Sequence, residues 1–203
     1  MKRLKSKNRG TGLRKRVIIE AALECFTVLG YHDTAVSDIR EKAGVSIGSL
    51  YHHFRSKEQL AGAVYLEGIL DYQAGFLAAL RKETDAEKGI LAIVKYHLQW
   101  VDGNKSWANY LLKMRYLECV TQHETEFAEL NKEFVGRIAA WFGKHISTRA
   151  IRRLSPDLYA PILIGPCQEF ARSYLDGCSV TKINAAAKEL ASAIWRALKG
   201  EVL

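Results

Sequence analysis

The chain of 203 residues has few of the residues that interrupt helices or cross-link secreted proteins. It has three prolines, and its four cysteines are widely spaced and form no CxxC pair. Such spacing favours reduced core residues over a disulfide framework or a zinc site. No apolar run is long enough to cross a bilayer, and the first residues show no signal-peptide pattern. We therefore expect a globular protein of the cytoplasm.

Sequence signatures of enzymes are also missing. The chain has no serine elbow, no phosphate-binding glycine loop and no catalytic cysteine motif. Cys119, His123 and Glu126 are separated by four and three residues, but Thr121 is expected to interrupt the helix and separate these ligands. We predict no enzyme activity, no metal site and no cofactor.

Acidic residues are absent from residues 1–16, which carry eight lysines and arginines. The net formal charge of the whole chain is +8, so residues 17–203 sum to zero. A concentrated basic segment is typical of proteins that bind nucleic acid, although a solvated tail gives the same charge run. We expect residues 1–10 to form a flexible basic arm that adds contacts to the DNA backbone or minor groove.

The remaining sequence has helical periodicity and no convincing strand. Apolar residues recur at intervals of three and four, and capping boxes are expected at Ser56–Gln59, Thr84–Glu87 and Thr121–Glu124. Pro161 and Pro166 fall inside one helical pattern, where they predict a kink or break. The sequence predicts an all-α protein of about nine helices, near residues 14–29 (or from 11), 34–43, 46–54, 56–82, 84–102, 105–119, 121–145, 155–176 and 179–199.

Two short helices with a sharp turn at Gly44 stand out in residues 34–60. Gly44 can take the left-handed conformation that such a turn requires, and Thr34 and Ser46 are good N-cap residues. Apolar residues at helical spacing form the inner faces, which leaves residues 46–49 and 51–52 outside. Those outer residues are small, hydroxylic or aromatic and include no acid, which suits close approach to DNA. We therefore predict a helix-turn-helix.

Residues 30–58 resemble the amino-terminal domain of TetR/AcrR-family transcriptional regulators. The resemblance rests on Gly30-Tyr31, Thr34, Ile39, Ala43-Gly44-Val45-Ser46, Gly48, Leu50-Tyr51-His52-His53-Phe54 and Ser56-Lys57-Glu58. It implies an all-helical homodimer whose recognition helix binds a palindromic operator and whose second domain binds a small effector. We accordingly expect a helix-turn-helix DNA-binding domain over residues 11–56 and an effector-binding and dimerisation domain over residues 57–203. Arg40 departs from the pattern, since a small alanine usually stands there, and its long side chain can reach towards a phosphate.

Side-chain chemistry suggests how this domain contacts DNA. Ile47 can press on a thymine methyl group and the Ser49 hydroxyl can pair with several bases. We assign phosphate contacts to Tyr51, His52 and Thr34, and to Lys57 at the first turn of its helix. The complete predicted DNA-binding set is Thr34, Arg40, Ser46, Ile47, Gly48, Ser49, Tyr51, His52 and Lys57.

Aromatic residues are dense between residues 57 and 145. One interpretation is a mostly apolar pocket for a small apolar or aromatic effector, with His97 or Gln99 setting specificity. The other is an ordinary helical core. The candidate pocket residues are Tyr65, Tyr72, Phe76, Tyr96, His97, Trp100, Trp107, Tyr110, Met114 and Phe127.

The last two predicted helices have apolar stripes that suit a dimer interface built as a four-helix bundle. An intramolecular core is the alternative. The candidate interface residues are Ile162, Phe170, Tyr174, Ile183, Ala187, Leu190 and Ile194.

Together these features predict a dimeric, sequence-specific DNA-binding regulator, in particular a repressor released from a palindromic operator by a small effector. The alternative is a regulator of the same fold that is controlled by a protein partner or by cysteine oxidation. A small helical enzyme is a third interpretation, which the missing catalytic motifs disfavour.

Overall fold

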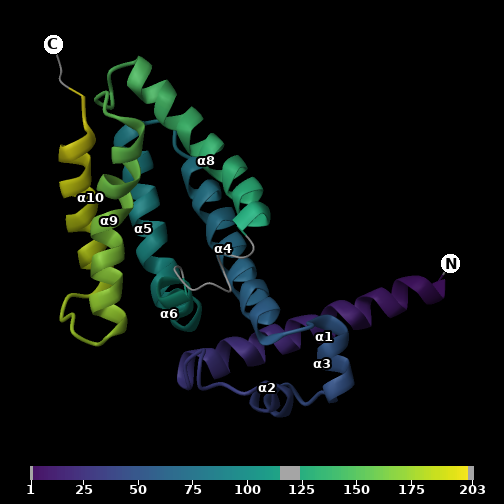
Figure 1. Ribbon diagram of the computed structural model, residues 1–203. Helices are drawn as coiled ribbons and strands as arrows, with labels where there is room; N and C mark the ends of the chain where they lie inside the picture. The colour runs from purple at the N-terminus through teal and green to yellow at the C-terminus, as the bar shows by residue number, and fades with distance from the viewer. Residues whose placement is uncertain (1, 115–123, 201–203) are drawn as a thin grey trace. The chain divides into compact units, whose positions relative to one another are not determined.

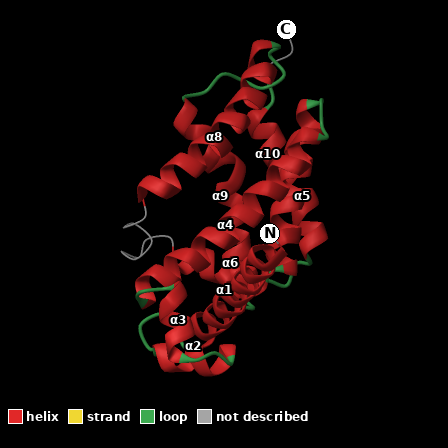
Figure 2. Ribbon diagram, turned by 90° about the vertical axis from the view of Figure 1, so that its right-hand side faces the viewer, coloured by secondary structure: helices red, strands yellow, loops and turns green. Residues whose placement is uncertain are grey.

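The computed structural model describes residues 2–114 and 124–200, with side chains for residues 12–114, 128, 129 and 131–200. Within these residues every regular element is a helix, and one isolated antiparallel bridge joins Ile151 to Lys199 (Figures 1 and 2). This confirms the predicted all-α class. The helices are α1 (Lys2–Val28), α2 (Val36–Ala43), α3 (Ile47–His53), α4 (Lys57–Arg81), α5 (Ala86–Gly103), α6 (Lys105–Met114), α8 (Glu124–Ser147), α9 (Pro156–Leu175) and α10 (Ile183–Leu198).

The chain forms two compact units. Unit 1 comprises Met1–Ile69 and Asn109–Glu124, and unit 2 comprises Leu70–Ala108 and Thr125–Leu203. Helices α4 and α6 therefore each contribute residues to both units. The two units divide within α4, whereas the predicted domain boundary was its start at residue 57. Sequence signals mark where a helix begins and ends, but they do not mark where a helix changes its packing partner.

Unit 1 is organised around α1, which packs against α2. The predicted apolar face of α1 is buried at Ile18, Ala22 and Phe26, and Ile39 of α2 and Leu50 of α3 are buried with it. Helix α1 begins at Lys2, so the segment expected as a flexible arm is part of this helix. No proline interrupts residues 2–28, and glycines at 10 and 12 each cost a helix only about 1 kcal/mol relative to alanine.

Unit 2 is built around α5, which packs against both α9 and α10 (Figure 1). Helix α5 buries an apolar stripe that includes Ile90, Ile93, Val94 and Leu98, because these positions recur at intervals of three and four. The same core contains Phe76 and Leu80 of α4, Phe142 of α8, Leu163 and Cys167 of α9, and Ile183, Ala187, Ala191, Ile194 and Leu198 of α10.

Two helix starts in unit 2 differ from the sequence predictions. Helix α5 is capped by Asp85, whose carboxylate accepts the Lys88 N–H at 2.9 Å, and not by Thr84. Helix α10 begins at Ile183 instead of Ser179.

Helix α9 is continuous through Pro161 and Pro166, although the sequence predicted a kink or break there. Pro161 and Pro166 are both exposed, so the helix carries both rings along its surface without interruption. The predicted Thr121–Glu124 capping box reaches outside the described residues.

Candidate nucleic-acid interface

The turn between α2 and α3 has the predicted geometry. Gly44 takes φ 62° and ψ 32°, and its N–H donates to the Glu41 carbonyl at 3.1 Å. The Val45 N–H donates to the Arg40 carbonyl at 3.2 Å, so the last carbonyls of α2 are satisfied across the turn. The Ser46 hydroxyl then accepts the Ser49 N–H at 3.2 Å and caps α3. The sequence therefore predicted both the turn and the start of the recognition helix.

The outer face of α3 holds most of the predicted DNA-binding residues. Ile47 and Tyr51 are 50% and 48% exposed, and Ser46, Gly48 and His52 are also exposed. Ser49 lies on the same short helix, whereas Leu50 and Phe54 are buried on the opposite face. Ile47 and Tyr51 are four residues apart, so their exposed side chains share one face of α3. The structure thus brings the candidate base-reading residues, Ile47 and Ser49, onto the same helix as Tyr51.

The structure corrects the role predicted for Thr34. Its side chain is only 2% exposed, and its hydroxyl lies within hydrogen-bond distance of the Gly30 carbonyl at 2.6 Å and the Cys25 carbonyl at 3.2 Å. The N-cap of α2 is Ala35, whose N–H is accepted by the Asp38 carboxylate at 2.8 Å. Thr34 therefore holds the loop to the end of α1, and its hydroxyl is not available to a phosphate.

Lys57 was also predicted as a phosphate contact, and its ammonium group is already occupied. Lys57 Nζ donates to the carbonyls of Tyr31 at 2.9 Å, His32 at 3.2 Å and Thr34 at 3.1 Å. It also lies 4.7 Å from the centre of the Tyr31 ring. An ammonium has three N–H donors, so these carbonyls use all of them. Lys57 connects the first turn of α4 to the loop between α1 and α2, a contact that no sequence motif indicates.

The start of α4 combines this contact with the predicted capping box. The Ser56 hydroxyl accepts the Gln59 N–H at 3.2 Å, and the Gln59 side chain accepts the Arg55 N–H at 2.6 Å. Glu58 in the same turn accepts a hydrogen bond from the Tyr31 hydroxyl at 3.2 Å. Its own backbone amide and the Ser56 hydroxyl are the main causes that hold the pKa of Glu58 below its usual value. A carboxylate in the first turn is favourable for the helix dipole.

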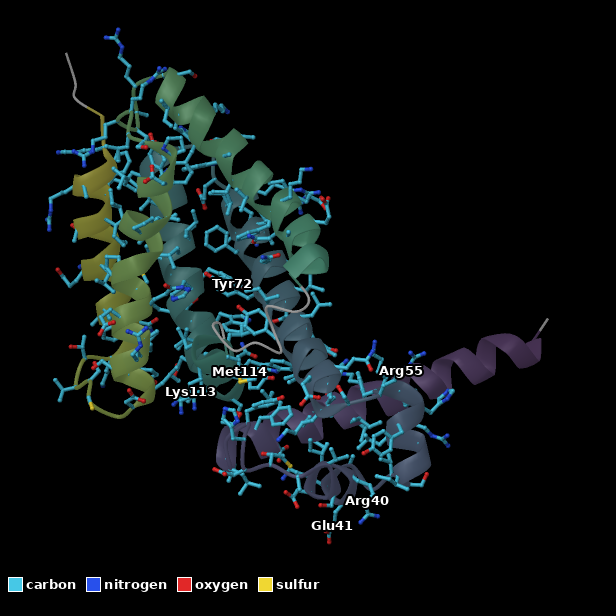
Figure 3. All side chains as sticks on the ribbon, viewed as in Figure 1. Arg40, Glu41, Arg55, Tyr72, Lys113 and Met114 are labelled. Carbon is cyan, nitrogen blue, oxygen red and sulfur yellow. The ribbon has the colours of Figure 1, made fainter. Side chains whose placement is uncertain are left out.

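Several basic residues beside the carboxyl end of α3 were missed as individual contacts. Lys15 of α1 places Nζ 5.9 Å from the centre of the Phe54 ring. The pKa of His53 is lowered by its partial burial and then by the positive charges of His52, Lys15 and Arg14, so these groups lie close together. Arg55 follows Phe54 directly, is exposed, and lies where α3 leads into α4 (Figure 3). We call Arg14, Lys15 and Arg55 the flanking basic cluster.

Arg40 departs from the expected alanine but does not disrupt the helix pair. Its side chain is half-buried, and it projects from α2 together with Glu41 (Figure 3). Helices α2 and α3 remain in contact, with Ile39 fully buried. Partial burial of Arg40 is what a long basic side chain gives when its aliphatic part is covered and its charged end stays in solvent.

The predicted effector residues fall into two groups. Tyr72, Phe76, Tyr96, His97 and Trp100 lie together in unit 2, with Tyr72 in contact with each of the other four rings. The candidates in unit 1 are elsewhere: the Tyr110 hydroxyl donates to the Ala61 carbonyl at 2.9 Å, Met114 is buried and Tyr65 is half-buried. Trp107 is half-buried in α6, and the side chain of Phe127 lies outside the described residues.

Three residues predicted for a dimer interface belong to the core of unit 2. Ile183, Ala187 and Ile194 are 7%, 3% and 3% exposed and pack within the same chain. The apolar stripe of α10 was expected to face a partner subunit, but it faces α5 instead, because period alone does not identify the packing partner. The remaining candidates, Ile162, Phe170, Tyr174 and Leu190, are half-buried.

The sequence predicted neither a membrane span nor a metal site. No described helix is both long enough and apolar enough to span a membrane. No three His, Cys, Asp or Glu side chains among the described residues are grouped so that they could hold a metal ion. Cys119 and His123, which were considered as ligands, lie outside the described residues.

The turn at Gly44 and the exposed α3 define a helix-turn-helix protein, joined here to a second helical unit. Comparison with known proteins gives the family. Residues 18–64 match the family described as bacterial regulatory proteins, tetR family. The chain belongs to this TetR family of transcriptional regulators.

Individual relatives support this assignment over different lengths of the chain. The transcriptional repressor KstR2 of Rhodococcus jostii is 32% identical over 127 residues, or 62% of this chain. The match covers 61% of KstR2, so the chain spans about three fifths of this curated relative.

Two solved structures share the fold. A TetR-family regulator from Marinobacter aquaeolei covers 97% of the chain and 100% of its own, with a TM-score of 0.79 and 16% identity. Bacillus subtilis FadR, solved in complex with stearoyl-CoA, covers 88% of the chain and 96% of its own, with a TM-score of 0.75 and 20% identity.

Proposed function

We propose that the protein is a homodimeric, sequence-specific DNA-binding regulator that represses transcription from a palindromic operator and is released by a small effector. The observation that supports this best is the outer face of α3, where exposed Ile47 and Tyr51 stand beside Ser46, Gly48 and His52 without an acidic side chain. Such a surface can approach base edges in the major groove closely.

Sequence is recognised by Ile47 and Ser49, and register is set by phosphate contacts. Tyr51 and His52 keep the phosphate roles predicted from the sequence. The flanking basic cluster takes the place of Thr34 and Lys57, whose donors are used within unit 1. Because phosphate contacts dominate the salt dependence of binding, this cluster makes affinity fall steeply as salt rises.

Dimerisation uses the outer surfaces of α9 and α10. Leu158 is 43% exposed and Ile162, Phe170 and Leu190 are half-buried, so apolar surface remains after the core of unit 2 is formed. A two-fold dimer presents two recognition helices to half-sites about one DNA turn apart, or about 34 Å. The operator is therefore palindromic.

Effector control acts through α4, which has residues in both units. An effector that prefers a dimer with a different spacing of its recognition helices must weaken DNA binding by its own difference in affinity for the two states. The repressor role of KstR2 and the stearoyl-CoA complex of FadR support repression and effector binding as properties of similar proteins.

Control by cysteine oxidation finds little support at two of the cysteines. Cys25 and Cys167 are buried, and burial raises the pKa of both thiols, that of Cys167 to about 12. A thiol that stays protonated is a poor nucleophile. Melting temperatures distinguish control by a small effector from control by a protein partner. A small effector at a hundred times its Kd adds roughly 2.7 kcal/mol of stability and raises the melting temperature of the purified protein, whereas a regulator controlled by a protein partner shows no such rise with small molecules.

The proposed roles on α3 are tested with single alanine variants and a library of DNA sites. Ser49→Ala should change the preferred base at one position of each half-site, whereas Tyr51→Ala should weaken binding to all sites about equally. Lys95→Ala on the exposed surface of α5 is the control and should bind like the wild type. A uniform loss with Ser49→Ala together with altered preference in Tyr51→Ala would reverse the assignment.

A further inference from the structure

Five rings in unit 2 form a cluster centred on Tyr72, which projects from α4 towards α5 (Figure 3). The Tyr72 ring centre is 5.2 Å from Trp100, 5.6 Å from His97, 5.8 Å from Tyr96 and 5.9 Å from Phe76. Tyr96, His97 and Trp100 all lie on α5. We call these five residues the aromatic cluster.

Most polar atoms of the aromatic cluster have partners. The Tyr96 hydroxyl donates to the Tyr72 carbonyl at 2.9 Å, and Trp100 Nε1 donates to the Asp71 carboxylate at 2.9 Å. The exception is His97, which is 7% exposed: its Nδ1 lies 2.8 Å from the Tyr72 hydroxyl, but its buried Nε2 has no hydrogen-bond partner among the described residues. Buried polar atoms are nearly always paired in native proteins, so this atom calls for an explanation.

The hydrogen bond to Tyr72 determines which nitrogen of His97 carries the proton. Burial raises the pKa of Tyr72 well above its usual value, so the phenol keeps its proton. No other acceptor for that proton is found among the described residues, so the hydroxyl donates to Nδ1. Burial also lowers the pKa of His97 to about 4, which leaves a neutral ring at physiological pH. The single remaining ring proton is then on Nε2, which is a donor without an acceptor in the described part of the chain.

The charges near the aromatic cluster limit what kind of acceptor can approach. The Asp71 carboxylate contacts the aromatic cluster through Trp100 Nε1. Burial is the main cause that raises the pKa of Tyr96 to about 12, and the negative charge of Asp71 is the second cause. Asp71 itself is exposed, but an anionic ligand among the buried rings would lose its hydration and lie near this carboxylate, which is unfavourable. A neutral oxygen acceptor meets no such opposition.

We propose that the effector is a neutral molecule with a flat apolar body and a carbonyl-type oxygen, and that His97 Nε2–H donates a hydrogen bond to that oxygen. This rests on the proposed function, in which unit 2 binds an effector. The rings of the aromatic cluster contact one another, so the ligand enters by separating the α4 rings from the α5 rings. Binding thereby displaces α4, the helix that has residues in both units.

The ligand class is tested with three probes of one shape: 2-acetylnaphthalene, 2-ethylnaphthalene and 2-naphthoate. Their affinities are measured by tryptophan fluorescence on the full-length protein and on the His97→Leu variant. The wild type should bind the ketone about 2–10-fold more tightly than the hydrocarbon, as one hydrogen bond provides, and bind naphthoate most weakly. His97→Leu should bind ketone and hydrocarbon equally.

A matched control is His145, a second buried histidine whose Nε2 has no hydrogen-bond partner among the described residues; its ring centre lies 4.2 Å from that of Trp141. His145→Leu should retain the preference for the ketone. The proposal is overturned if His97→Leu keeps that preference, if the wild type shows none, if naphthoate binds best, or if no probe binds.

A ligand-free measurement separates this proposal from a purely structural role of His97. The double variant Tyr72→Phe, His97→Leu removes both polar partners at nearly constant shape, so its melting temperature should equal or exceed that of the wild type. Long-range nitrogen–proton NMR should place the ring proton of His97 on Nε2. A lower melting temperature, or a proton on Nδ1, overturns the proposal. Operator binding by the wild type tests the proposed function separately, since it does not depend on His97.

Discussion

Replacing Lys57 with methionine should destabilise unit 1 without weakening its hold on DNA phosphates. The substitution keeps most of the length of the side chain but removes three hydrogen bonds to the carbonyls of Tyr31, His32 and Thr34 and the interaction with the Tyr31 ring. A hydrogen bond to a charged group contributes about 1.5–3 kcal/mol and an exposed cation–π contact about 0.5–1 kcal/mol. These bonds share one ammonium group and are partly exposed, so we expect unit 1 to be destabilised by about 2–3 kcal/mol in total.

Hydrogen exchange of the amides in α2 and α3 measures this destabilisation. A loss of about 2–3 kcal/mol makes the open form of unit 1 about 30-fold or more populated, so these amides should exchange faster in the variant by the same factor. DNA binding is measured at temperatures where the variant stays folded. In Lys57→Met, the slope of log affinity against log salt concentration should equal that of the wild type. In Lys15→Met, the slope should become less steep by about 0.9 for each phosphate that the Lys15 side chain neutralises in the wild type. If Lys57→Met lowers the slope and leaves exchange unchanged, Lys57 contacts phosphate and our account of the loop is wrong.

Further predictions concern the turn, the buried loop, histidine ionisation and the basic cluster. Gly44→Ala should destabilise unit 1 by about 1–2 kcal/mol in urea unfolding, because a Cβ there meets no neighbour within 4 Å but φ is 62°. Thr34→Val should cost about 1 kcal/mol by the same measurement, with no change in the salt slope of DNA binding. Acid should destabilise unit 2 between pH 6.5 and pH 4 by about 3 kcal/mol through His97, because its folded pKa is about 4 and the unfolded chain takes up the proton first. His97→Leu should remove this contribution and leave that of His145, whose pKa burial also lowers. Arg55→Gln should lower the salt slope without lowering stability, which a single urea and salt series on the variant determines.

The fold and the DNA-reading helix were accessible from sequence because their signals are local. Gly44, Ser46 and the Ser56–Gln59 pair each act on backbone groups within four residues, and the structure shows the predicted hydrogen bonds. Helix types follow from apolar spacing for the same reason. The start of α5 was predicted one residue too early because Thr84 and Asp85 can each cap a helix. Helix α10 begins after Lys182 without a side-chain cap, so no local signal marks its start.

The contacts that depend on distant parts of the chain were not accessible. The Lys57 ammonium binds carbonyls more than twenty residues earlier, and nothing in the sequence marks them as acceptors. Likewise Ile183 and Ile194 form an apolar stripe whose period fits a partner subunit and the chain's own α5 equally well. The aromatic candidates had the same ambiguity, and only the folded structure separates the five rings that meet in unit 2 from the candidates in unit 1.

Selection of DNA fragments from a random pool by the purified protein, followed by sequencing, tests the central claim most directly. We expect an enriched palindrome whose half-sites lie about one helical turn apart, bound far more tightly than its scrambled control at the same salt concentration. Folded protein that enriches no sequence, or that binds the palindrome and the scrambled control equally, would contradict the assignment of α3 as a recognition helix and with it the proposed function.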